Sequence, residues 1–176
     1  MEKISRKIKV LMLVAITIGT TILAGIPSTL AGDSDTFDIT VTGQYITLAV
    51  DKASWSVNSG VLVAMSRSYY TNATDTFTAD STGSSVNVDV KLQITTDGGT
   101  WHAATSGNNP AADTYKLNAS IDTWSTQVQI LTASATIIKT NLAAGQQTFD
   151  LKFMSPTSTT TGTQQTITVT ASAIAS

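Results

Sequence analysis

Residues 86–94 read VNVDVKLQI, and this stretch decides the fold. Apolar side chains occupy every even position from 86 to 94, and polar or charged side chains occupy every odd position between them. Successive side chains of a β-strand point to opposite faces, so a period of two gives one strand a dry face and a wet face. The stretch therefore predicts a half-buried strand, and sheets with one wet face are typically antiparallel.

The same alternation recurs along the rest of the chain. Further runs with this period lie at residues 37–41, 46–50, 115–121, 128–130, 149–153 and 167–171. Turn-forming residues separate the runs, and Asp97-Gly98 has the chemistry of a hairpin tip. Residues 61–70 are ambiguous in period and are interpreted as a strand. Sheets with one dry face bury it against each other, so we predict an all-β fold: an antiparallel β-sandwich, Ig-like or jelly-roll, with about nine strands.

The first 31 residues have the pattern of a secretory signal peptide. A basic start precedes an apolar stretch over residues 10–26, and the small residue Ala31 follows the helix breaker Pro27. We predict a signal-peptide helix over residues 1–31, one β-sandwich domain over residues 32–176, and a secreted or cell-surface location. The alternative is an uncleaved anchor, because the run approaches the roughly 17 residues that span a bilayer. In both cases only the signal segment contacts the membrane and the domain faces outward.

Composition argues against several classes of function. The chain has no cysteine, which excludes disulfides and thiolate metal sites. Basic residues beyond residue 31 stand singly, whereas nucleic-acid binding requires clustered Lys and Arg. His102 is the single histidine, no G-x-S-x-G motif accompanies it, and no Asp lies in an apolar setting that suits a glycosidase. We therefore expect no enzyme activity, no catalytic residues and no cofactor.

An acidic cluster follows the predicted cleavage site. Asp33, Asp35 and Asp38 supply carboxylate oxygens of the kind that calcium prefers, although the spacing does not match an EF-hand loop. The alternative interpretation is a solvated leader ahead of the first strand. No other candidate metal ligands are predicted.

Two tryptophans and two asparagines are candidates for contact with, or attachment of, carbohydrate. Trp101 and Trp124 lie in polar surroundings, where a flat ring stacks on a sugar; core packing is the alternative, and is favoured for Trp55. Asn72 and Asn118 begin the N-glycosylation sequons Asn-Ala-Thr and Asn-Ala-Ser. Such short patterns also arise by chance in a sequence rich in Thr and Ser.

Several short motifs together resemble a broad group of prokaryotic envelope proteins with Ig-like or WxL-like β-sandwiches. The motifs are Tyr45-Ile-Thr-Leu48, Trp55-Ser-Val57, Asn87-Val-Asp-Val90, Asn141-Leu-Ala-Ala-Gly145 and the closing Leu151-Lys-Phe-Met-Ser-Pro156 with Gln165-Thr-Ile-Thr-Val169. Because Trp55-Ser-Val57 is not a strict W-x-L, peptidoglycan binding is not carried over from this resemblance.

The layout is also similar to fibre subunits of the TasA and archaeal bundling-pilin type, in which an N-terminal strand of one subunit completes the sandwich of the next. This resemblance implies a donor strand within residues 33–41, with Phe37, Ile39 and Val41 on the inserted face. The alternative is that this strand pairs within its own domain. The expected function is a secreted structural subunit of a filament, matrix or surface layer whose partner is another copy of itself. A cell-surface carbohydrate-binding or adhesin module that binds polysaccharide is the second expectation.

Overall fold

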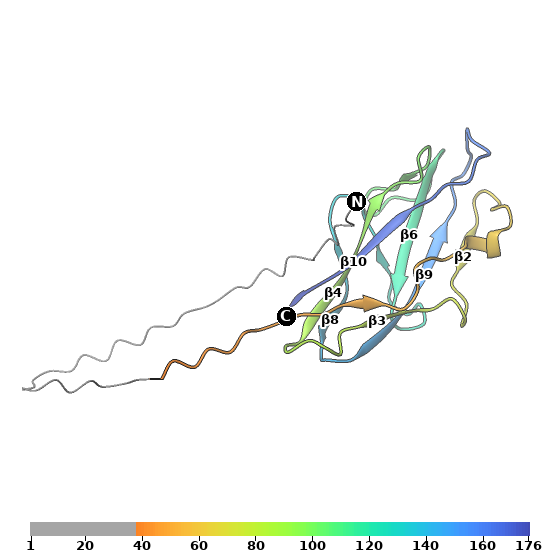
Figure 1. The fold of residues 1–176 in the computed structure, drawn as a ribbon. Coiled ribbons are helices and arrows are strands. Elements are labelled where there is room, and N and C mark those ends of the chain that lie inside the picture. The colour runs from red at the N-terminus through yellow and green to blue at the C-terminus, as the bar shows by residue number, and fades with distance from the viewer. Residues whose placement is uncertain (1–37) are drawn as a thin grey trace, which may run out of the picture. The chain divides into compact units, whose positions relative to one another are not determined.

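The computed structural model describes residues 38–176, which are nearly all β (Figure 1). Contacts divide the chain into two units, Met1–Tyr45 and Ile46–Ser176. Within the first unit, residues 38–45 form neither helix nor strand, and every one of them is exposed. The predicted signal peptide, its cleavage site and Phe37 lie outside the described residues.

The larger sheet is built around two long antiparallel strands, β6 and β9. Its order is β1-β3-β9-β6-β5, and in addition β2 pairs with β9 and β7 pairs with β6. The strands are β1 (Ala49–Val50), β2 (Ser68–Tyr70), β3 (Phe77–Asp80), β5 (His102–Ala103), β6 (Thr114–Ser120), β7 (Val128–Gln129) and β9 (Gln146–Met154). The short pair β5 and β6 is parallel, whereas the other strands pair in antiparallel fashion.

The smaller sheet has three strands in the order β10-β4-β8. They are β4 (Val88–Thr96), β8 (Thr136–Leu142) and β10 (Thr168–Ala175). β4 contains most of the VNVDVKLQI stretch and is the central strand. β10 pairs with β4 along its whole length, from Ala175 opposite Val88 to Thr168 opposite Thr96.

One short 3₁₀ helix, η1 (Val57–Gly60), lies between β1 and β2. Within residues 38–176 no helix has the length and apolar character needed to cross a membrane.

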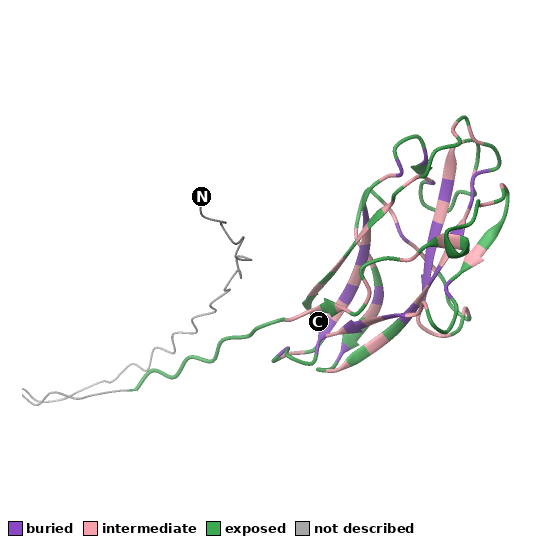
Figure 2. Cartoon of the chain, turned by 45° about the vertical axis from the view of Figure 1, so that its right-hand side comes forward, coloured by how far each residue is buried: buried purple, intermediate pink, exposed green. Residues whose placement is uncertain are grey.

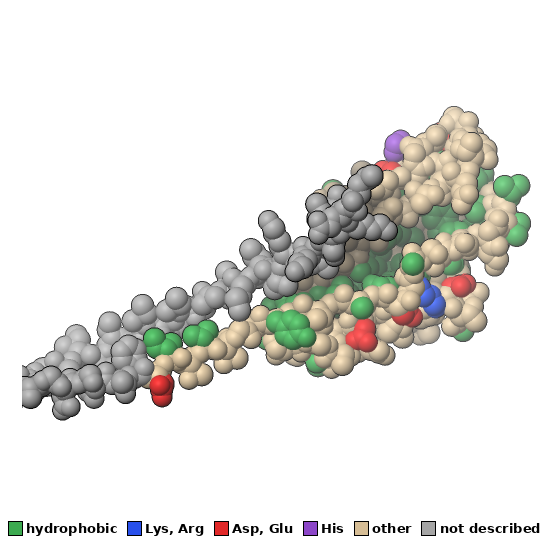
Figure 3. All heavy atoms as spheres, in the orientation of Figure 1, with side chains coloured by type: hydrophobic (Ala, Val, Ile, Leu, Met, Phe, Trp, Pro, Cys, Tyr) green, Lys and Arg blue, Asp and Glu red, His purple; other side chains and the backbone are tan. Residues whose placement is uncertain are grey.

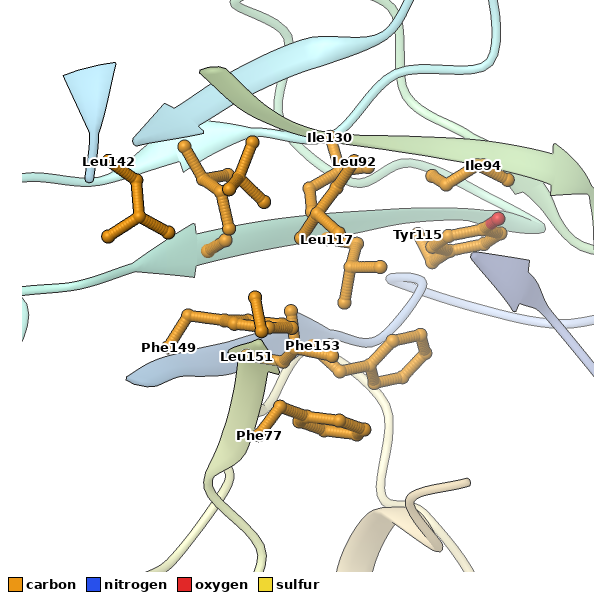
Figure 4. Close-up of a cluster of buried hydrophobic side chains, with 14 of the residues drawn as sticks. Phe77, Leu92, Ile94, Tyr115, Leu117, Ile130, Leu142, Phe149, Leu151 and Phe153 are labelled. Atoms are coloured by element: carbon orange, nitrogen blue, oxygen red, sulfur yellow. The ribbon is translucent and has the colours of Figure 1, made fainter. Parts of the chain in front are cut away.

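The two sheets pack their apolar faces against each other. Along β4, buried residues alternate with partly buried ones, and Figure 2 shows such alternating bands on the long strands. Leu92 and Ile94 of β4 face Leu117 and Tyr115 of β6 in the core (Figure 4). Burial of each large apolar side chain contributes about 1.5–3 kcal/mol, so this interlayer contact is the main source of stability.

The predicted all-β class is confirmed, and the strongest alternating runs correspond to β4, β6, β9 and β10. Three predicted strands are wrong or much shorter: residues 38–41 form no strand, residues 46–50 keep only Ala49–Val50, and residues 61–70 keep only Ser68–Tyr70. Left-handed backbone at Asn58, Ser59 and Gly60, with φ of 54°, 53° and 79°, turns the chain just before the last of these runs.

The predicted hairpin at Asp97-Gly98 forms only in part. Gly98 bridges Trp101, but the returning strand β5 then leaves β4 and pairs in parallel with β6. The turn chemistry was thus recognised correctly, whereas the destination of the strand depends on tertiary contacts.

Candidate functional site

The free edge of β10 is the most distinctive surface of the Ile46–Ser176 unit. In the part of the chain that the structure describes, β10 pairs with β4 alone. The Ser176 amide donates a hydrogen bond to the Asn87 carbonyl over 3.0 Å, and hydrogen-bonded pairs alternate with non-bonded pairs along an antiparallel ladder. The backbone N–H and C=O groups of Val169, Ala171 and Ala173 therefore point away from β4, toward the free edge.

This edge lacks the protection that natural sheet edges usually have. Charged side chains, prolines, bulges and short length all discourage pairing with another chain. β10 has eight residues, none of them charged or proline, and its register against β4 shifts only between Thr168 and Val169. The opposite edge strand, β8, carries Lys139 and pairs with β4 through two register shifts. One edge of the smaller sheet is protected and the other is open.

The inward-facing side chains of β10 are incompletely buried. Val169, Ala171 and Ala173 pack against the core but remain partly exposed, whereas Val90 and Leu92 on the neighbouring strand are at most 2% exposed. The inward-facing side chains of β10 are therefore covered on the β4 side and uncovered on the side of the free edge.

The larger sheet shows the same incomplete burial on this side of the molecule. In the larger sheet, β1, β2 and β3 lie on the side of β9 that is away from β6. In the smaller sheet, β8 contacts β7, which lies on the β6 side. Because β10 and β8 are opposite edges of the smaller sheet, β10 lies on the side of β1 and β3. Leu48 and Val50 also pack against the core while staying partly exposed. We call the surface formed by Leu48, Val50, Val169, Ala171 and Ala173 the apolar seam. Figure 3 shows hydrophobic side chains gathered in a hollow between the two layers.

The segment before this unit carries exposed apolar side chains. Ile39 and Val41 are 76% and 68% exposed, and the polar residues Thr40 and Thr42 alternate with them. Residues 38–41 therefore keep the period-two pattern of a strand without forming one. The alternative interpretation, in which this segment pairs as a strand of its own domain, is not found for residues 38–41.

Trp101 is not available to a sugar, which corrects the prediction that it contacts glycan. The residue is 9% exposed and its ring stacks on Phe153 with centroids 6.1 Å apart. Its indole Nε1 donates a hydrogen bond to the Thr159 hydroxyl over 2.7 Å. The loop that precedes β10 covers this tryptophan, and the polar sequence around Trp101 gives no sign of that cover.

Trp124 lies on the outer face of the larger sheet and remains a candidate for sugar contact. It meets Tyr70 edge to face, with ring centroids 5.1 Å apart, and Lys152 Nζ lies 5.2 Å from the centre of the Tyr70 ring. Trp124 has a left-handed φ of 72°, and its amide donates a hydrogen bond to Ser120 Oγ. We call Tyr70 and Trp124 the aromatic pair. Sequence reasoning missed Tyr70, because residues 61–70 are ambiguous in period and do not indicate which of Tyr69 and Tyr70 faces outward.

The two sequons differ sharply in their surroundings. Asn118 lies within β6, is 8% exposed, and donates a hydrogen bond from Nδ2 to Gln127 Oε1 over 3.2 Å. This corrects its prediction as a glycosylation site, because a transferase cannot reach a buried amide in a central strand. Asn72 is exposed in the turn that follows β2.

The predicted calcium ligands are not brought together by the described chain. Asp33 and Asp35 lie outside the described residues, and Asp38 is exposed. Residues 38–176 contain no cluster of three His, Asp or Glu side chains suited to a metal ion. The one histidine, His102, lies with Nδ1 3.6 Å from Asp97 Oδ2.

A shallow depression of about 500 Å³ lies beside β5 and is lined by Ala103, Ala104, Thr105, Asn108, Asn109, Ala111 and Thr114. None of these lining side chains is charged, so the depression offers no group for acid or base chemistry.

Comparison of the chain with protein-family models, curated proteins and solved structures found no match. The most informative features are therefore the open edge of β10, the apolar seam and the aromatic pair.

Proposed function

We propose that the protein is a secreted structural protein, a subunit of an extracellular filament, matrix or surface layer. In this proposal the two sheets are an antiparallel β-sandwich of Ig-like or jelly-roll type, and a donor strand from a second copy extends it beside β10. The unprotected edge of β10 is the observation that carries the proposal. Secretion is supported by the signal-peptide pattern of residues 1–31.

Strand addition requires backbone groups for pairing and space for alternate side chains. The free edge supplies the N–H and C=O groups of Val169, Ala171 and Ala173. Two of these residues are alanine, and their small side chains leave room in the apolar seam for larger groups from a donor. Ile39 and Val41 are such groups, and Phe37 continues their period of two.

The exposure of the donor side chains is itself part of the support. Burial of an Ile or Val side chain contributes about 1.5–3 kcal/mol, and each ladder hydrogen bond adds about 0.5–1.5 kcal/mol. Association costs several kcal/mol in lost freedom, so assembly depends on the whole inserted face. Single changes on that face are therefore expected to alter assembly measurably.

The donor face is tested with two paired variants of the secreted protein. I39D/V41D places charges on the face proposed to enter the seam, whereas T40D/T42D places the same charges on the opposite face. Negative-stain microscopy and sedimentation should show filaments or large assemblies for the wild type and T40D/T42D, and monomers for I39D/V41D. Wild-type protein that stays monodisperse at high concentration contradicts the proposal, as does equal assembly of both variants.

The acceptor edge is tested with proline, which removes one backbone N–H. A171P removes an N–H that points to the free edge, so the ladder with β4 is kept. S172P removes an N–H directed at β4 and is expected to destabilise the monomer. A171P should fold but should not accept a donor, so small amounts added to wild type should shorten the assemblies. Unchanged assembly by folded A171P argues against β10 as the acceptor.

A carbohydrate-binding or adhesin module is the second candidate function, and the aromatic pair, in which Tyr70 is exposed and Trp124 is partly exposed, favours it. Aromatic faces bind the CH groups of sugars, and Lys152 beside the pair suits a polar or acidic saccharide. Titration with soluble polysaccharide should change tryptophan fluorescence in the wild type but not in W124F. Silence on a glycan array together with unchanged fluorescence counts against this function.

A further inference from the structure

The turn between β2 and β3 presents the Asn72 amide to solvent in a fixed orientation. Asn72 Oδ1 accepts hydrogen bonds from the Thr74 amide at 2.9 Å, the Thr74 hydroxyl at 2.6 Å and the Asp75 amide at 3.1 Å. All of these bonds use the oxygen of the carboxamide. No hydrogen bond from Nδ2 is found within residues 38–176, so the nitrogen is left facing outward.

Contacts from two other parts of the chain hold this turn. Lys52 Nζ donates hydrogen bonds to the carbonyls of Thr74, at 2.7 Å, and Thr76. The Thr76 hydroxyl donates to Asp150 Oδ1 at 2.7 Å, which joins the turn to β9. The sequon is therefore an exposed feature of the folded chain, in contrast to the buried sequon at Asn118.

The residue two positions before the sequon is aromatic and lies on the same face. Tyr70 and Asn72 are exposed, while Thr71 between them is 7% exposed, as alternation along an extended chain requires. Tyr70 keeps 47% of its surface in solvent although Trp124 and Lys152 contact its ring. An apolar surface suited to a sugar ring thus lies next to the exposed amide.

We propose that Asn72 is the N-glycosylation site of this protein and that the first sugar attached to it packs on the aromatic pair. The modification takes place outside the cytoplasm, so its occurrence in the cell rests on the proposed secretion. Asn118 stays unmodified because its side-chain amide is buried and donates a hydrogen bond to Gln127. The hydrophobic contact makes the glycan a part of the folded surface and not merely a flexible appendage.

The transfer uses a polyprenyl-phosphate-linked oligosaccharide as the donor. Asn72 Nδ2 attacks C1 of the first sugar and forms the C1–N bond. The bond between C1 and the phosphate oxygen breaks, and its electron pair leaves with the polyprenyl phosphate. The proton lost from Nδ2 passes to a base of the oligosaccharyltransferase. No oxidant or reductant is required.

The test uses the purified full chain, a purified oligosaccharyltransferase and a polyprenyl-phosphate-linked oligosaccharide, with peptide mapping by mass spectrometry. Synthetic peptides of residues 69–76 and 115–122 serve as unfolded controls, and both should be modified. The folded chain should be modified at Asn72 and not at Asn118. A folded chain unmodified at Asn72 while its peptide reacts, or equal modification of Asn118, overturns the proposal. Export and assembly take no part in this assay, so their failure is scored separately.

Three variants separate the chemistry of the sequon from the stability of the turn. N72D keeps the Oδ1 acceptor of the turn but has no amide nitrogen, so it should fold and remain unmodified. T74V removes the hydroxyl and should lose the modification, whereas T74S keeps the hydroxyl and should retain it. Modification of folded T74V at the wild-type rate contradicts the assigned role of the sequon.

The packing of the sugar is tested through melting temperatures of modified and unmodified protein. The wild type should show a higher melting temperature when glycosylated, and this shift should disappear in Y70A. S68A changes the same face of β2 two residues earlier and should keep the shift. Because each variant is compared with its own unmodified form, direct effects of the substitution cancel. Equal shifts in wild type and Y70A overturn the packing claim.

Discussion

The Trp101 indole donates its Nε1 hydrogen to the Thr159 hydroxyl across 2.7 Å, and this bond fastens the loop before β10 to the core. The backbone adds a second link, because Gln165 Oε1 accepts hydrogen bonds from the Thr100 and Trp101 amides. The strand that we propose as acceptor therefore begins at an anchored position.

Replacement of Thr159 by valine should weaken this anchor. T159V keeps the shape of the side chain but leaves the indole N–H without its acceptor, which costs about 1–3 kcal/mol. Urea unfolding followed by circular dichroism measures the loss. T166V, an exposed threonine of the same loop, is the matched control and should stay within about 0.5 kcal/mol of the wild type. Equal stability of both variants contradicts the anchor.

Alkaline pH should destabilise the protein through Tyr115. Burial, together with the hydrogen bond that the Tyr115 hydroxyl donates to the charged Asp97, raises the pKa of this phenol above its usual value of 10.0. A raised folded-state pKa gives stability that is complete below the unfolded value and is lost as pH rises beyond it. Thermal melts should thus fall above about pH 10. In Y115F this part of the alkaline loss should be absent, and an unchanged alkaline slope argues against the assignment.

Acid should loosen the loop that carries Trp124. Hydrogen bonds from the Thr126 amide and the Ser120 hydroxyl lower the pKa of Asp122 below its usual value of 3.8. A lowered folded-state pKa gives stability that is present above the unfolded value and is lost as pH falls below it. Trp124 emission should change in this range, and W124F should lack the change. D122N should show the acid-type emission already at neutral pH.

Truncation of Phe153 should be severe, because its buried ring packs between two other aromatic rings of the core. It stacks on both Trp101 and Tyr115, with centroids 6.1 Å and 5.6 Å away. F153A should cost about 3–5 kcal/mol in urea unfolding, through lost burial and a cavity. The control I174A removes a side chain that is 44% exposed, so it should cost much less. Similar losses in both variants contradict the assigned core.

Period-two alternation predicted the long strands because their inward faces are buried without interruption. It failed for β8, because the exposed face carries the apolar Ile137 directly before the buried Ile138, so the polarity of the sequence does not alternate there. It also failed for β3, whose inward residues Phe77 and Ala79 form too short a run to stand out. Turn and irregular backbone, including a left-handed φ of 56° at Ser66, replace the first part of the strand predicted over residues 61–70.

The candidate site was less predictable than the fold. The alternating segment around Ile39 was visible in the sequence, but the free edge of β10 depends on sheet order, which local sequence does not encode. The two tryptophans have similar polar neighbours in the sequence, yet Trp101 is buried and Trp124 is partly exposed. The loop that covers Trp101 is distant in the chain, so the local sequence gives no sign of it. The two sequons, in contrast, were separable from the sequence, because Asn118 lies within the alternating run at residues 115–121 and Asn72 lies in none of the predicted runs.

The unequal edges of the smaller sheet have a geometric consequence. Because β8 is protected and β10 is open, a copy that joins others as proposed accepts one neighbour and donates to one neighbour. Such a head-to-tail contact does not use the same patch twice, so it propagates without closing by two-fold symmetry. The product is an unbranched polymer with direction: one terminus ends in an unfilled edge, and the other ends in an unused N-terminal segment.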